Sequence, residues 1–115
     1  MPSNTPGEIE LYSHFSQHLG PKFEAAGLRL QFHCNQPSGI HFQVATSAEY
    51  RAAITRGIHE GMAERFPEFL ATGGVYVTEI TDNKIDSCER AFYRVARSVV
   101  EQAFVLAVSM NYARG

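Results

Sequence analysis

The feature that most constrains the fold is a change of hydrophobic period near the middle of the chain. Leu28–Cys34 alternates strictly between apolar and polar residues, and Ile40–Val44 alternates again. From Ser47 onward the apolar residues recur at four-residue steps instead: Tyr50, Ile54, Ile58, Met62 and Phe66. A period of two is typical of a strand with one buried face, and a period of 3.6 is typical of an amphipathic helix. The chain therefore combines half-buried strands with helices that cover them.

Two more strands and a second helix follow from the same reasoning. Glu8–Phe15 alternates as a strand does, and Val75–Ile80 is rich in β-branched residues. Asp86 and Glu89 have the spacing of a helix capping box, which predicts a helix that starts there and runs to about Val108. Its apolar face is made of Phe92, Val95, Ala96, Val99, Ala103, Leu106 and Ala107. Ser47 is the expected N-cap of the first helix, which should end before Pro67.

The remaining segments have the composition of turns. Gln17–Gly27 contains Gly20-Pro21 and is predicted to be a connecting loop, with a short turn of helix at Phe23–Ala26. Asn35–Gly39 lies between two alternating strands, which predicts a β-hairpin around it.

The predicted order is strand, strand, strand, helix, strand, helix. Two helices can cover one face of a four-stranded sheet and leave the other face to solvent, so we expect an α/β (α+β) two-layer sandwich. At 115 residues the chain has the length of one domain. We expect a disordered leader over residues 1–7, a single domain over 8–110 and a frayed tail over 111–115.

Charge and composition exclude several functional classes. Ten Lys and Arg against twelve Asp and Glu give a net charge of −2, which disfavours tight, autonomous nucleic-acid binding. The longest apolar run, Ala103–Val108, is far below the roughly 20 residues that span a bilayer. Met1–Gly7 has no signal-peptide pattern, so a soluble cytoplasmic protein with reduced cysteines is expected. No phosphate-loop motif is present, which argues against GTPase activity.

Several residue patterns together resemble domain IV of translation elongation factor G. They are Glu49-Tyr50, Ala53-Ile54 and Gly57-Ile58, then Gly74-Val75, then the run Asp86-Ser87-Cys88-Glu89-Arg90-Ala91-Phe92. The hairpin residues Gly39–Phe42 also lie where that family has a Gly-aromatic-acid-Phe strand start. The resemblance extends over roughly Glu8–Ala107, which is nearly the whole chain.

This resemblance implies the fold shared with a small-subunit ribosomal protein domain and the GHMP kinases, including a left-handed strand-helix-strand crossover. In the parent factor the domain contacts tRNA and mRNA in the decoding site through loops at its tip. The matching segments here are Gln17–Gly27 and Thr81–Ile85, and both depart from the family pattern. The first has Gly-Pro-Lys-Phe-Glu in place of a Gly/Arg/Gln/Tyr/Gly/His stretch, and the second lacks the family's Gly, aromatic residue and His.

A small set of basic and polar residues is the candidate nucleic-acid contact: Lys22, Asn83, Lys84, Arg90, Arg94 and Arg97. The three arginines share one stripe of the second helix, where they can face a phosphate backbone. The competing interpretation is a solvated helix face that Glu101 partly balances.

The other chemistry-bearing residues have simpler explanations. His14 and His18 are four apart but lie in a predicted strand and loop without a third ligand, so no metal or other cofactor is expected. His33 and His41 lie on the polar faces of the predicted hairpin, where they can approach each other across it, although two surface histidines suffice to explain them. Cys88 is expected in the first turn of a helix, as a small half-buried residue or a thiolate. No catalytic constellation has a recognisable local signature.

The sequence therefore predicts a noncatalytic binding module of the elongation factor G domain IV type, associated with the ribosome or RNA. The main alternative is a protein–protein interaction or self-association module that pairs through the exposed edge strand Glu8–Phe15. A small enzyme on the same scaffold is a third hypothesis.

Overall fold

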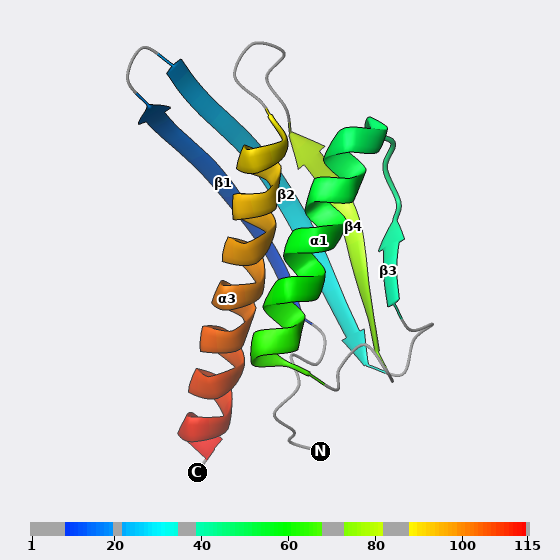
Figure 1. Cartoon of the computed structure of the whole chain (residues 1–115). Helices are drawn as coiled ribbons and strands as arrows, with labels where there is room; N and C mark the ends of the chain where they lie inside the picture. Colours follow the sequence, from blue (N-terminus) through cyan, green and yellow to red (C-terminus); the bar gives the residue numbers. More distant parts are fainter. Residues whose placement is uncertain (1–8, 20–21, 35–38, 68–72, 82–87, 115) are drawn as a thin grey trace.

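The chain folds into one mixed four-stranded sheet with two helices packed on it. The computed structural model describes residues 9–19, 22–34, 39–67, 73–81 and 88–114. The elements in chain order are β1 Ile9–Leu19, β2 Lys22–Cys34, β3 Gly39–Phe42, α1 Ala48–Arg65, β4 Gly73–Thr81 and α3 Glu89–Arg114. The order of strands in the sheet is β1-β2-β4-β3. Both helices lie on one side of the sheet (Figure 1), so the predicted two-layer sandwich is confirmed.

β1 and β2 form a long antiparallel ribbon that the sequence did not predict. The two strands pair from Ile9 with Phe32 to Leu19 with Lys22. The expected loop over Gln17–Gly27 and its helical turn at Phe23–Ala26 are therefore wrong. Within this segment, residues 20–21 lie outside the described part of the chain. Ala25 and Ala26 are buried, so this part of β2 packs within the protein instead of forming an exposed loop.

Gly27, which the sequence places in a loop, lies inside β2, where it pairs with His14 of β1 and Thr81 of β4. The Tyr12 side chain passes over it, and the Tyr12 hydroxyl donates a hydrogen bond to Thr81 Oγ1 at 3.4 Å. A Cβ atom on Gly27 would meet the Tyr12 hydroxyl and would lie 2.9 Å from the Thr81 Cβ. The glycine thus makes room for a neighbouring side chain.

β4 lies between β2 and β3, so the predicted hairpin of β2 and β3 is wrong. β4 pairs antiparallel with β2 and parallel with β3. Alternation identifies a strand and its buried face, but it carries no information about which strand becomes the neighbour. Ile40 and Phe42 still turn toward the core, as the alternation predicts, but they do so beside Val75 and Val77 of β4.

The connection from β3 through α1 to β4 is a left-handed crossover. In Figure 1 the helices lie in front of the sheet, β3 and β4 point the same way, and β4 lies to the left of β3. Nearly all such connections are right-handed, so the handedness is an uncommon property of this fold. It agrees with what the resemblance implied.

Both helices begin close to where the sequence predicts. Ser47 caps α1, and its Oγ accepts a hydrogen bond from the Tyr50 backbone N–H at 3.2 Å. α1 ends at Arg65, before Pro67. α3 starts at Glu89 and remains helical to Arg114, beyond the predicted end near Val108 and through the expected frayed tail at 111–114. The predicted cap residue Asp86 lies outside the described residues.

The core lies between the sheet and the helical layer. Its main residues from the sheet are Leu28, Leu30, Phe32, Val75 and Val77. The helices contribute Ile54, Ile58, Met62, Phe66, Phe92, Val95, Val99 and Ala103. These are the apolar positions that the two periods indicated. Leu106 is the exception, since it is 39% exposed and lies next to Val105, which is 55% exposed.

α1 and α3 pack closely because two glycines of α1 face α3. A Cβ atom on Gly57 would lie 2.7 Å from the Tyr93 carbonyl oxygen and 2.8 Å from the Ala96 Cβ. A Cβ atom on Gly61 would lie 3.0 Å from the Val100 side chain. The Gly57-Ile58 pair noted in the sequence thus combines close helix approach at Gly57 with a core side chain at Ile58.

Candidate functional site

The candidate site is the sheet face opposite the helices. Strand alternation places Leu28, Leu30 and Phe32 of β2 in the core, so the residues between them point the other way. In β4 the same alternation buries Val75 and Val77 and turns Tyr76 outward. The resulting open face contains Glu10, Tyr12, Arg29, Gln31, His33, His41, Tyr76 and Glu79.

Tyr76 occupies the centre of this face, between two histidines. The His41 ring centroid lies 4.9 Å from the Tyr76 centroid, with the two planes 27° apart. The His33 ring meets Tyr76 edge-on, with centroids 5.3 Å apart and planes at 87°. We expected His33 and His41 to approach each other across a hairpin. That expectation is wrong, because β4 intervenes and both imidazoles contact Tyr76 instead.

Tyr76 is the candidate site residue that the sequence reasoning missed. The signal was present, since Tyr76 alternates with Val75 and Val77 and must therefore lie on the polar face of its strand. A half-buried aromatic ring on the polar face of a central strand, in contact with two further rings, makes this face a candidate binding surface.

A hydrogen-bonded chain fixes the orientation of the polar groups beside Tyr76. Gln31 Nε2 donates to a Glu10 carboxylate oxygen at 3.2 Å. This orients the Gln31 amide, so its Oε1 must accept the hydrogen bond from His33 Nε2, also 3.2 Å long. Neutral His33 therefore carries its proton on Nε2 and presents Nδ1 as an acceptor.

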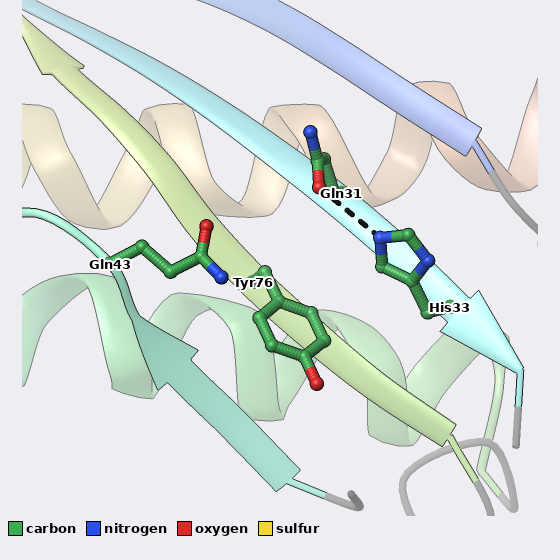
Figure 2. Close-up of a pocket in the computed structure, with 4 residues that line it drawn as sticks. All are labelled: Gln31, His33, Gln43 and Tyr76. Carbon is green, nitrogen blue, oxygen red and sulfur yellow. Dashed lines mark hydrogen bonds between the residues drawn. The ribbon is translucent and has the colours of Figure 1, made fainter. Parts of the chain in front are cut away.

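An open hollow of about 330 Å³ lies among these groups and is lined by Gln31, His33, Gln43 and Tyr76. Figure 2 shows these four side chains, with Tyr76 lying across β4 between Gln43 and His33. Two amides, one phenol and one imidazole supply donors and acceptors there, and none of the described residues that line the hollow is a carboxylate. The site is suited to hold a planar polar group.

A second group of side chains on the same face surrounds Arg29 and balances its positive charge. Arg29 Nε donates to Glu79 Oε1 at 2.9 Å, and its Nη1 lies 3.9 Å from Glu10 Oε2. The hydrogen bond to Glu79 is the largest cause that raises the pKa of Arg29 above its usual value. The Arg29 guanidinium also lies 5.1 Å from the centre of the Tyr12 ring. Arg29 is thus already bound to acidic partners.

The predicted arginine stripe lies partly along the junction of α1 and α3. Arg97 Nη2 donates to Glu64 at 2.8 Å, and its Nη1 donates to Tyr93 at 3.2 Å and to Glu60 at 3.3 Å. The hydrogen bond with Tyr93 is the largest cause that raises the pKa of Arg97. Arg97 therefore joins the two helices.

Glu101, which we expected to balance the stripe, instead binds Arg65 of α1 at 2.8 and 3.0 Å. Arg90 and Arg94 are exposed on α3. Lys22 begins β2, and its side chain is outside the described part. Asn83 and Lys84 also lie outside the described residues.

The remaining candidates do not come together as a site. His14 and His18 both lie in β1, and the described residues contain no group of three or more His, Cys, Asp or Glu that could hold a metal ion. Cys88 is half-buried and lies just before α3, with a free thiol. Among the helices described, none is both long and apolar enough to cross a membrane.

Comparison with known proteins supports the fold and no more. No family model matches the chain, and no curated protein matches its sequence. Solved structures do match its fold. One is the crystal structure of a protein from Thermus thermophilus, with a TM-score of 0.68 and 17% identity. The match covers 79% of this chain and only 14% of that chain, so the fold occurs there as one small part of a much longer protein.

Proposed function

We propose that this chain is a noncatalytic, cytoplasmic binding module of the elongation factor G domain IV type. Its proposed partner is the ribosome or RNA that is not part of a ribosome. The observation that carries the proposal is the aromatic and polar open face of a sheet whose fold includes the left-handed crossover. The occurrence of the same fold within a much longer chain also supports it, because such a unit serves there as one part of a larger protein.

The open face supports binding rather than catalysis. Acid–base chemistry requires titratable groups that converge on one enclosed point. The hollow at Tyr76 is open, and the described residues that line it are two amides, one phenol and one imidazole, with no second acid–base pair among them. A shallow surface of this kind suits reversible contact with a large partner.

Co-sedimentation with purified ribosomes tests this proposal. We expect association at about 50 mM salt, where electrostatic contacts are strongest, and weaker association at about 200 mM. Arg94→Ala measures the contribution of the arginine stripe, and Ala52→Gly, an exposed change on α1, is its control. Absence of association at low salt removes the ribosomal part of the proposal.

Self-association through β1 is the second candidate, and one observation favours it. β1 is an edge strand of 11 residues that contains neither proline nor lysine, the residues that natural edge strands use to prevent pairing. Light scattering distinguishes the candidates, since a dimer that RNA leaves unchanged supports self-association. His14→Lys should weaken such a dimer because it adds a charge at the edge, whereas Ala52→Lys adds the same charge on α1 and should not.

A further inference from the structure

Two polar groups at the hollow keep hydrogen-bonding capacity that no described residue uses. Within the described part of the chain, neither the Tyr76 hydroxyl nor the Gln43 side-chain amide makes a hydrogen bond, whereas the Gln43 backbone N–H donates to the Val77 carbonyl oxygen at 2.9 Å; both residues line the hollow. His33 adds the Nδ1 acceptor, because its Nε2 proton is bound to Gln31. The Tyr76 ring thus carries a hydroxyl that can donate and accept, and the Gln43 side-chain amide and His33 Nδ1 line the same hollow.

The Tyr76 ring is held in place before any ligand arrives. The His41 ring lies nearly parallel to it at 4.9 Å, and the His33 ring meets it edge-on at 5.3 Å. The chain Glu10–Gln31–His33 in turn fixes the His33 ring. A ligand that stacks on this cluster loses little additional side-chain entropy, since the rings are already ordered.

These properties select a class of ligand. The π surface favours a planar group, and the amide and imidazole favour an edge on which donors and acceptors alternate. Unpaired nucleobases combine both properties, and open sheets with exposed aromatic residues bind them by stacking. The Glu10 carboxylate accepts a hydrogen bond from Gln31 and lies 3.9 Å from the Arg29 guanidinium, so its charge is partly balanced within the sheet face.

We propose that Tyr76, supported by His33, His41 and Gln43, is a stacking site for one unpaired base of single-stranded RNA. This inference rests on the proposed function and names its contact surface. That surface is the open sheet face, not the two segments that correspond to the parent family's tip loops. The Tyr76 ring receives the base, and Gln43 and His33 bind the edge of the base.

The charge distribution fixes the expected salt dependence. Arg29, which lies on this face, is bound by Glu79 and lies near Glu10, so it is poorly placed to neutralise an RNA phosphate, and RNA binding there should release few counterions from the RNA. Binding at Tyr76 should therefore depend on stacking and hydrogen bonds. We expect the logarithm of the affinity to fall with the logarithm of salt concentration with a slope no steeper than about −1.

Fluorescence anisotropy with a labelled RNA hexamer of mixed sequence tests the site. Tyr76→Phe keeps the ring and should bind within about twofold of the wild type. Tyr76→Leu removes the ring and should weaken binding roughly 5- to 150-fold, the effect of losing one stacked base. Gln43→Ala is an exposed change that should weaken binding roughly 2- to 10-fold, because it removes one hydrogen-bonding group.

Controls separate loss of the site from loss of the fold. Tyr93→Leu removes a ring from the helical layer and should leave hexamer affinity unchanged. Thermal melting of each variant shows that it is folded at the assay temperature. The same RNA in duplex form should compete poorly, because its bases are already stacked on one another.

The outcomes distinguish this site from the broader function. If ribosomes co-sediment with the protein but Tyr76→Leu binds the hexamer as well as Tyr76→Phe, the stacking site is wrong and the proposed function stands. A steep loss of hexamer affinity with increasing salt also overturns the assignment. So does a neutral oligosaccharide that displaces the RNA and whose own binding is lost in Tyr76→Leu. If neither ribosomes nor the hexamer bind, both proposals fail.

Discussion

Replacing Gly57 by alanine should destabilise the protein, although the same change usually stabilises a helix. In an exposed helix the substitution gains about 1 kcal/mol because glycine has the higher conformational entropy when unfolded. Here the new Cβ would lie 2.7 Å from the Tyr93 carbonyl oxygen and 2.8 Å from the Ala96 Cβ. Carbon atoms pack at about 3.5–4.0 Å, so the two helices would have to separate locally.

The magnitude follows from these two opposed effects. Overpacking costs typically ~1–3 kcal/mol, and the upper end applies because one of the two obstructing atoms belongs to the backbone of α3. Subtracting the gain of about 1 kcal/mol leaves a net loss of about 2 kcal/mol in the free energy of unfolding. For a domain of this size that corresponds to a fall in Tm of about 8 °C.

Two further variants of α1 isolate the causes. Gly61→Ala meets only the Val100 side chain, at 3.0 Å, which can shift by a few tenths of an ångström, so its net effect should be about zero. Ala63→Gly, at an exposed position of the same helix, measures the propensity effect alone and should cost about 1 kcal/mol. Urea unfolding followed by circular dichroism measures all three. A Gly57→Ala protein as stable as the wild type would refute the close-packing argument.

Three more substitutions test other parts of the structure by urea unfolding. Ser47→Ala removes the cap of α1 and should cost about 1 kcal/mol, whereas Ser47→Asp should retain most of the stability; equal losses would contradict the capping role. Arg97→Ala should cost about 1 kcal/mol at low salt and less in 1 M NaCl, and a loss independent of salt would show that charge is not the cause. Gly27→Ala should cost roughly 1–3 kcal/mol, and less when combined with Tyr12→Phe, which removes the obstructing hydroxyl; strictly additive costs would contradict that contact.

The sequence predicted the elements and their buried faces well because both depend on local periodicity. The four-residue steps from Tyr50 to Phe66 identified α1 and its core positions, and Ser47 was correctly placed at its cap. The alternation in Leu28–Cys34 identified the residues of β2 that face the helices. These properties are determined within a few residues of the chain, so no knowledge of distant neighbours is needed.

The errors concern properties that depend on distant partners. Composition indicated a loop at Gln17–Gly27, but pairing with β1 overrode the local preference of Gly27, whose missing side chain makes room for Tyr12. The partner of β3 could not be inferred from alternation, so the contacts of His33 and His41 were misassigned. Alternation alone places Tyr76 on the open face, but it does not show that His33 of β2 and His41 of β3 contact its ring.

The central position of β4 has a consequence for folding during synthesis. β3 pairs only with β4, and β4 is translated after both β3 and α1. A nascent chain that ends before Gly73 contains β1, β2 and β3 but lacks β4. In such a chain β1 and β2 can pair, but β4 is absent as the neighbour of both β2 and β3. The four-stranded sheet therefore cannot be complete until β4 has emerged, and α3, which packs on β1 and β2, is synthesised after it.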